Sequence, residues 1–314
     1  MPGLLADIDP DGLLEFSVVF TDRSVNHMSF KFQDVMKEIS ETLKRVYNAK
    51  AVAVVPGGGT YGMEAVARQF ATGKKCLVVR NGFFSFRWTQ ILEMGSIASE
   101  HTALKASRIS DAVDAPFSPK PANEVCDFIQ SDKSKVVFAP HVETSAGIIL
   151  PDEYIKAVAE ATHKAGGLFV LDCIASGAMW VDMETLGVDV LISAPQKGWS
   201  ASPCSALVMM SERARRAIEE TSSSSFANDL KKWLQIMETY EDGGHAYHAT
   251  MPTDALIQFR DAMRETDVYG LEKLRGLQIE LGKRIRELLL TKGIKSVAAE
   301  GFQAPGVIVS YTGD

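Results

Sequence analysis

The chain has 314 residues, of which 46% are hydrophobic and 23% charged, a composition typical of a soluble globular protein. Its 33 basic and 40 acidic residues give a net charge of −7 at pH 7, which argues against a nucleic-acid-binding surface. The longest apolar stretch, residues 166–181, contains Asp172 and is too short to span a bilayer. An N-terminus with Asp7, Asp9 and Asp11 does not look like a secretory signal. We therefore expect a cytoplasmic protein without membrane or nucleic-acid partners.

The predicted elements alternate along the chain. Apolar residues recur every three or four positions from residue 32 to 47, which predicts an amphipathic helix. The predicted strands are residues 51–56, 75–79, 135–140, 167–172, 188–193 and 205–210, with helices between them that include 83–94 and 152–165. Strands that are apolar on both faces and alternate with helices predict a mainly parallel sheet covered on both sides. The last strand follows its predecessor too closely for a helical crossover, so this pair should be antiparallel and the sheet mixed.

The C-terminal part has a different character. A serine-rich stretch at 221–226 is followed by helical patterns, including a long helix over 270–293, and then by one apolar strand at 306–311. A chain of this length exceeds the usual size of a single core. We therefore expect a large domain over residues 1–250, and bridging helices with an incomplete small α+β domain over 251–314.

Cysteine and histidine usage gives no sign of a disulfide framework or a metal site. The four cysteines are far apart and have apolar neighbours, as buried reduced thiols do: Cys76, Cys126, Cys173 and Cys204. His245 and His248 have no carboxylate or cysteine set near them, so we expect no bound metal.

Polar residues follow most of the predicted strands, where open α/β sheets bind their ligands. The glycine-led turn of Gly58, Gly59 and Thr60 opens a helix, and its bare N–H groups suit a phosphate, although three glycines also fit a simple tight turn. Aromatic residues at 83–88 and polar residues at 143–145 follow two further strands. Helix packing accounts for most of the aromatic residues when they are taken alone, and a capped turn is the alternative for the polar ones.

Asp172 and Lys197 add the most specific signal. Asp172 ends a buried strand, where a carboxylate needs a cation or a strong donor beside it. Lys197 follows the next strand, in a turn whose small and apolar residues predict enclosure; a surface loop lysine is the alternative. Together with a glycine turn and an aromatic side chain, these residues meet the needs of pyridoxal phosphate. A lysine forms the Schiff base, an aspartate keeps the ring nitrogen protonated, and the helix takes the phosphate.

Several motifs occur in order over nearly the whole chain: "GGGTYGMEA", "NGFFSFRW", "ETSAG", "LDCIASG", "SAPQKGWSASPCSALV" and "YHATMP". In them the chain resembles the class V branch of fold-type I pyridoxal-phosphate aminotransferases, in particular the alanine–glyoxylate and serine–pyruvate aminotransferase group. The resemblance implies an α/β large domain with a mixed, mainly parallel seven-stranded sheet covered by helices. It also implies a homodimer with its active sites at the subunit interface, and a segment 1–28 that reaches the small domain or the partner subunit.

The resemblance further implies a role for individual residues. Lys197 is the Schiff-base lysine and Asp172 pairs with the ring nitrogen. The phosphate is bound by Gly58, Gly59, Thr60 and Gln196. Phe84 stacks on the pyridine ring, Ile174 packs beneath it, and Thr144 or Ser145 reaches its phenolic oxygen. Tyr247 and Thr250 reach the phosphate from the partner subunit.

Two departures from the family pattern bear on function. Residues 9–27 replace the usual opening segment, and the chain stops before the arginine that grips the substrate carboxylate. We expect a truncated version of a longer protein, with Arg23 as the alternative cation. The expected reaction moves an amino group from a small amino acid to a 2-oxo acid such as glyoxylate or pyruvate, by a ping-pong mechanism. The alternatives are a lyase or cysteine desulfurase-like enzyme of the same fold, and a catalytically impaired pyridoxal-phosphate-binding homodimer.

Overall fold

A seven-stranded sheet forms the centre of the computed structural model, which describes residues 25–312. Its strand order is β1-β11-β10-β9-β6-β2-β3. β11 pairs antiparallel with both β1 and β10, and the other neighbours are parallel, so the predicted mixed sheet is confirmed. The strands are β1 (Ala51–Pro56), β2 (Lys75–Arg80), β3 (Glu100–Lys105), β6 (Val136–Pro140), β9 (Leu168–Asp172), β10 (Val190–Ser193) and β11 (Ser205–Met210). Residues 1–24 lie outside the described residues. They include Arg23 and most of segment 1–28, which was expected to reach the small domain or the partner subunit.

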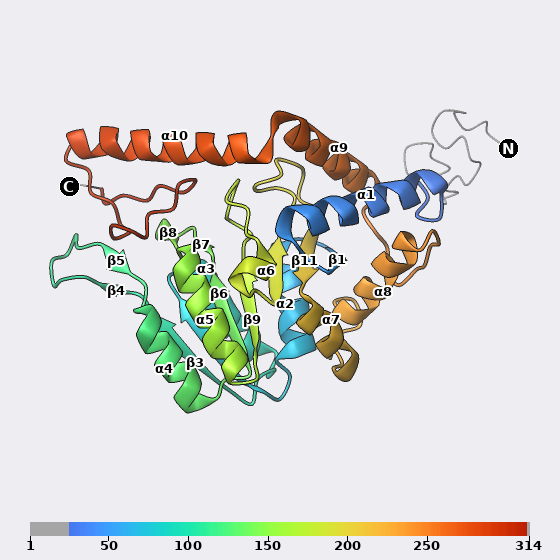
Figure 1. Cartoon of the computed structure of the whole chain (residues 1–314), viewed down its shortest axis with the longest axis horizontal. Coiled ribbons are helices and arrows are strands. Elements are labelled where there is room, and N and C mark those ends of the chain that lie inside the picture. The colour runs from blue at the N-terminus through green and yellow to red at the C-terminus, as the bar shows by residue number, and fades with distance from the viewer. Residues whose placement is uncertain (1–24, 313–314) are drawn as a thin grey trace.

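Helices cover the sheet. They are α1 (Phe30–Tyr47), α2 (Gly59–Phe70), α3 (Phe83–Met94), α4 (Ala122–Asp132), α5 (Asp152–Lys164), α6 (Met183–Leu186), α7 (Glu212–Ala217), the short 3₁₀ helix η1 (Ile218–Glu220), α8 (Leu230–Glu241), α9 (Thr253–Tyr269) and α10 (Leu271–Thr291). Every residue of β6, β9, β10 and β11 is buried, which requires cover on both faces. α4 and α5 lie side by side (Figure 1).

The edge strand β3 is the strand of the central sheet that the sequence patterns did not predict. Its residues, "EHTALK", alternate only weakly, and none of them is buried. It pairs with β2 alone, so it needs no continuous apolar run. Two antiparallel strand pairs form separate small sheets: β4 (Ser107–Arg108) with β5 (Phe117–Ser118), and β7 (Val142–Glu143) with β8 (Ile148–Ile149).

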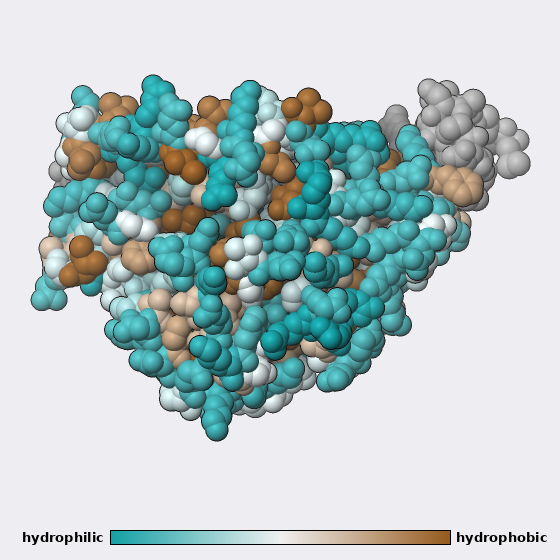
Figure 2. Space-filling view, in the orientation of Figure 1, coloured by the Kyte–Doolittle hydropathy of each residue, from teal (hydrophilic) through white to brown (hydrophobic). Residues whose placement is uncertain are grey.

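α10 lies apart from the central sheet (Figure 1). Gly282 is its only buried residue, and hydrophobic side chains such as Leu281 and Leu290 are 59% and 69% exposed. Figure 2 shows hydrophobic residues among hydrophilic ones along the upper edge of the molecule, where α10 lies in Figure 1. The strand predicted at 306–311 is wrong, since Ser310 makes only an isolated bridge with Ser296 and a strand requires a continuous row of paired neighbours. The domain division at residue 250 stays a prediction. No helix in the described part of the chain is long and apolar enough to cross a membrane.

Candidate active site

One cavity brings together residues that follow five strands. β1, β2, β6, β9 and β10 all run in the same direction, so their carboxyl ends lie at one edge of the sheet. The cavity has a volume of about 230 Å³. It is lined by Gly59, Thr60, Met63, Phe84, Arg87, Val142, Thr144, Asp172, Ile174, Ala175, Gln196 and Lys197. Eight of the twelve residues predicted for the site are among them.

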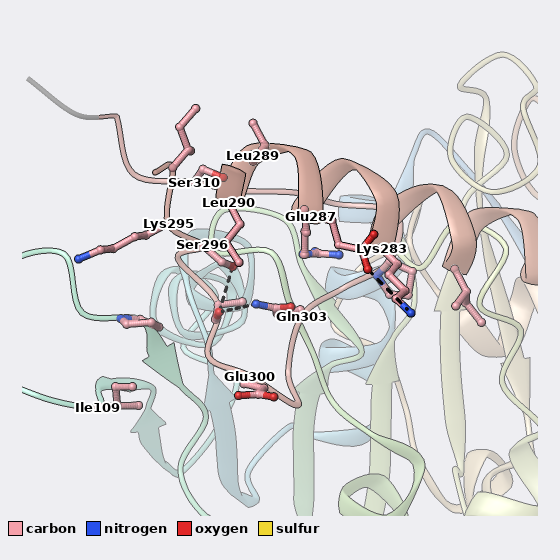
Figure 3. A pocket seen from close by; sticks show the side chains of 16 residues that line it. Ile109, Lys283, Glu287, Leu289, Leu290, Lys295, Ser296, Glu300, Gln303 and Ser310 are labelled. Atoms are coloured by element: carbon pink, nitrogen blue, oxygen red, sulfur yellow. Dashed lines mark hydrogen bonds and ion pairs between the residues drawn. The ribbon is translucent and has the colours of Figure 1, made fainter. Parts of the chain in front are cut away.

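A larger cavity lies elsewhere and contains none of the predicted residues. It has a volume of about 630 Å³ and lies between α10 and the segment that follows it. Figure 3 shows Leu289 and Leu290 of α10 on one side and Ser296 and Gln303 on the other. The volume of a cavity therefore does not identify the active site. The smaller cavity is the candidate because of the residues that line it.

The α2 N-terminus forms one end of the smaller cavity. Gly58 is the N-cap and Gly59 the first helical residue, and no side chain caps the helix, so its first N–H groups remain open to a ligand. A Cβ on Gly59 would lie 2.5 Å from Cδ1 of Ile174. Only a glycine allows the turn to approach the loop after β9 this closely.

Arg87 lies in the cavity wall and was missed by the sequence interpretation. Its guanidinium donates a hydrogen bond to Thr60 Oγ1 over 2.8 Å, and it lies 5.2 Å from the centroid of the Phe84 ring. Its position one helical turn after Phe84 on α3 is the sequence signal that could have identified it, because residues three apart share a helix face.

Of the polar residues in the turn after β6, some cap α3 and one lines the cavity. Glu143 is fully buried and accepts hydrogen bonds from the backbone N–H groups of Phe84 and Ser85, so it caps α3. Ser145 donates to Glu143 and accepts from the N–H of Phe83. Thr144 lines the cavity and Ser145 does not. The structure thus separates the two residues that the sequence left as alternatives.

Asp172 is a desolvated carboxylate in the cavity wall. It is 7% exposed, and within residues 25–312 its side chain has one hydrogen bond, accepted from the N–H of Ile174 over 3.0 Å. Burial is the main effect and raises the pKa of Asp172 to about 7. The hydrogen bond from Ile174 lowers this pKa, the negative charge of Glu143 raises it, and the positive charge of Arg87 lowers it. Among the described residues no cation pairs directly with this carboxylate, and the charge of Arg87 offsets only part of the effect of burial.

The loop after β9 is held from both sides. Buried His141 shares a hydrogen bond with the Ser176 hydroxyl over 2.8 Å. Burial lowers the pKa of His141 to about 4, helped by the charge of Arg275, so the imidazole is neutral at physiological pH. On the other side, Gly198 packs against Gly177 so closely that a Cβ on Gly198 would lie 2.3 Å from the Gly177 carbonyl oxygen. The loop that follows Asp172 at the end of β9 and the loop after β10 that contains Lys197 are therefore fixed against each other.

The predicted enclosure of Lys197 is wrong for the single chain. Its side chain is exposed in the turn after β10, where it lines the cavity. The apolar residues that suggested enclosure, Ala194 and Trp199, are buried in the core beneath the turn. The neighbouring Gln196 has a buried Oε1 atom with no hydrogen-bond partner among the described residues. The turn thus presents both a free amine and an unsatisfied amide.

Four predicted residues do not line the cavity: Gly58, Ser145, Tyr247 and Thr250. Tyr247 is 66% exposed and Thr250 is also exposed, both in the loop between α8 and α9. Of the cysteines, Cys76, Cys173 and Cys204 are buried and Cys126 is partly buried; all four are free, and burial raises the pKa of each thiol. No cysteine lines the cavity.

The mixed, mainly parallel seven-stranded sheet covered by helices matches the fold of the fold-type I aminotransferases. The sequence profile of the aminotransferase class-V family matches residues 15–305, and the chain belongs to this family. Members of the family depend on pyridoxal phosphate. The expected family resemblance is therefore confirmed.

Individual relatives are distant. Alanine–glyoxylate aminotransferase 1 of Saccharomyces cerevisiae is 25% identical, covering 93% of this chain and 77% of that protein. The small subunit of soluble hydrogenase from Synechococcus sp. (strain PCC 6716) is 26% identical, covering 90% of this chain and 71% of that protein. Rat alanine–glyoxylate aminotransferase is 26% identical, and this chain covers 65% of its length. Among solved structures, alanine–glyoxylate aminotransferase from Nostoc sp. has a TM-score of 0.80 at 22% identity, covering 92% of this chain and 74% of that one.

Proposed function

We propose that this protein is a pyridoxal-phosphate-dependent aminotransferase. It would move an amino group from a small, alanine- or serine-like amino acid to a 2-oxo acid such as glyoxylate or pyruvate, in two alternating half-reactions. The observation that carries the proposal is the cavity in which Lys197, Asp172 and the α2 N-terminus meet. Similarity to alanine–glyoxylate aminotransferases supports the substrate class.

The residues present fit the cofactor. The α2 N-terminus has N–H groups without a side-chain cap, which suit a phosphate. The amide oxygen of Gln196 is buried without a partner and needs a donor. Asp172 is desolvated and pairs directly with no cation among the described residues, and a protonated ring nitrogen would supply both a proton and a positive charge.

The proposed roles follow from these positions. Gly58, Gly59, Thr60 and Gln196 would hold the phosphate and Asp172 the ring nitrogen. Phe84 and Ile174 would flank the ring, and Thr144 would face its phenolic oxygen. When bound, pyridoxal phosphate supplies an aldehyde and an electron-poor ring that delocalises negative charge from the substrate Cα.

Lys197 is the proposed catalytic residue. Its amine at the cavity wall would anchor the cofactor, and on release would take a proton from the substrate Cα as a general base. In the reverse half-reaction the same amine would return a proton to Cα. Asp172, once ionised beside a cation, would hold the ring nitrogen in its protonated form.

A second copy of the chain would complete the site. Lys197, Tyr247 and Thr250 are all exposed in the single chain, as is the ring of Tyr61, the neighbour of Thr60 in the cavity wall. A homodimer that covers this face would bring Tyr247 and Thr250 of one subunit to the phosphate site of the other. It would also enclose Lys197, as its role requires.

The desulfurase alternative has no support among the described residues. That reaction needs a reactive thiolate at the site, and here each thiol is at least partly buried, has a raised pKa and lies outside the cavity. An impaired cofactor-binding protein differs from an active enzyme only in its response to amino donors.

An absorbance titration tests the proposal. The purified protein with pyridoxal phosphate should show the near-visible band of a lysine-bound aldehyde, and Lys197→Ala should lack it. Alanine or serine should shift the band to shorter wavelength, and glyoxylate or pyruvate should restore it. A band that no donor changes would favour the impaired binding protein, and an unchanged spectrum in Lys197→Ala would refute the proposed role of that residue.

A further inference from the structure

A second cavity lies on the other side of the first turn of α3. It has a volume of about 350 Å³ and is lined by Arg80, Asn81, Gly82, Phe83, Phe86, Lys105, Ala106 and Phe117. Arg80 and Lys105 end the neighbouring strands β2 and β3, so this cavity lies at the same carboxyl edge of the sheet as the candidate active site. The two cavities have no lining residue in common.

Two cations face each other in this cavity without an acidic partner. Arg80 and Lys105 are direct neighbours in the parallel register of β2 and β3. Within residues 25–312 neither of them forms an ion pair, whereas Lys75 at the start of β2 is bound to both Glu100 and Asp132. Like charges on directly neighbouring strand residues destabilise the pairing. A bound anion would remove this repulsion.

Asn81 adds an unsatisfied polar group to the cavity wall. It is 4% exposed, and neither its amide oxygen nor its amide nitrogen has a hydrogen-bond partner in the described structure. Its backbone N–H is already bound by the Ser85 hydroxyl, which fixes the turn but leaves the amide unpaired. A buried amide without partners is destabilising, and a ligand with a polar group could supply the missing hydrogen bonds.

The remaining walls are aromatic. Phe83 is 59% exposed, Phe86 lies beneath the Arg80 guanidinium at 4.8 Å, and Phe117 lies beneath that of Arg108 at 5.3 Å. Aromatic side chains of this kind suit a flat ring, and Arg80 and Lys105 give the cavity a positive charge. The cavity therefore combines a cationic, amide-bearing end with flat apolar walls.

We propose that this cavity is a second ligand site, separate from the active site, and that it binds a small aromatic carboxylate. The carboxylate lies between Arg80 and Lys105, beside Asn81 in the cavity wall. The ring lies among Phe83, Phe86 and Phe117. The site does not depend on the proposed aminotransferase activity.

Benzoate is the probe, and its binding is measured by ligand-observed and protein-observed NMR titration. The protein is first saturated with pyridoxal phosphate and treated with borohydride, which blocks the active site if the cofactor binds to Lys197. We expect saturable binding of benzoate, and affinity at least about tenfold lower in Arg80→Gln and in Lys105→Gln. Lys120→Gln, which removes a surface lysine paired with Glu124, should bind benzoate as the unchanged protein does.

Two uncharged or non-planar probes test the ligand class. Benzamide should bind more weakly than benzoate because it lacks the charge, and cyclohexanecarboxylate because it lacks the flat ring. Absence of saturable benzoate binding up to about 10 mM, or equal affinity in the unchanged protein and both charge variants, would overturn the proposal. If borohydride fixes no cofactor, the proposed function fails, while the Arg80→Gln and Lys105→Gln comparison still decides on the second site. Thermal unfolding of each variant verifies that it is folded.

Discussion

The Arg87 guanidinium donates a hydrogen bond to the hydroxyl oxygen of Thr60 over 2.8 Å and thereby joins α3 to the N-terminus of α2. These helices follow different strands, β2 and β1, and together they form two walls of the cavity. Because the Thr60 oxygen accepts from Arg87, its own proton is free to be donated to an anion at the α2 N-terminus. Arg87 is therefore a positioning residue for the proposed phosphate site.

Arg87→Met should weaken the binding of pyridoxal phosphate by about 10- to 100-fold, the loss expected for a hydrogen bond from a charged group. Arg87→Lys should recover part of the affinity. The dissociation constant is measured by titrating cofactor-free protein and following absorbance. Arg45→Met removes an exposed arginine paired with Asp267 and should leave the constant unchanged. Equal constants for Arg87→Met and the unchanged protein would show that Arg87 does not position this site.

Gly198→Ala should disturb the turn that carries Lys197. The added Cβ would lie 2.3 Å from the Gly177 carbonyl oxygen, so one of the two loops must move. We expect a loss of about 1–3 kcal/mol in the free energy of unfolding, and a weaker lysine-bound cofactor band. Gly276→Ala, in α10 with open space around it, should keep or raise the stability. Equal melting temperatures for the two variants would contradict this account.

Asp172→Asn should alter the pH dependence of stability in the cofactor-free protein. Burial raises the folded-state pKa of Asp172 to about 7 from 3.8, so between these values the folded chain holds a proton that the unfolded chain releases. The contribution of Asp172 to stability is therefore present below pH 4 and lost as the pH rises to 7, by roughly 4 kcal/mol at most. The melting temperature of Asp172→Asn should exceed that of the unchanged protein more at pH 8 than at pH 4.5.

The same substitution should have the opposite effect on cofactor binding, since asparagine cannot stabilise a protonated ring nitrogen. A melting-temperature difference that is identical at both pH values would show that Asp172 keeps an ordinary pKa. Undiminished aminotransferase activity in Asp172→Asn would remove its proposed role in catalysis.

The proposed exchange of residues between subunits predicts complementation. Lys197→Ala and the double variant Tyr247→Phe/Thr250→Val should each have little activity. If both residues act across the interface, a mixed dimer has one intact site, and re-association of equal amounts should recover about a quarter of full activity. No recovery, with mixed dimers present by mass spectrometry, would place Tyr247 and Thr250 in their own subunit's site or outside the site altogether.

Particular residues show how far the sequence leads. β6 and β9 were predictable because a strand buried on both faces is a continuous apolar run, and the residue after such a run lies at the ligand edge of a parallel sheet. That reasoning led to Asp172 and Lys197, which do line one cavity. β3 and the expected strand at 306–311 were misjudged because pairing at a sheet edge depends on neighbours rather than on a local pattern.

The sequence by itself determined the order of strands and helices, the α/β class and the residues that follow each strand, because apolar periodicity is a local property. Only the tertiary structure decided which of those side chains face the cavity. In the folded chain Thr144 lines the cavity, while Ser145 accepts a hydrogen bond from the first residue of α3. Arg87 of α3 contacts Thr60 of α2. The tertiary structure also left Lys197 exposed. Exposure and hydrogen-bond partners depend on segments far apart in the chain, and no local pattern records them.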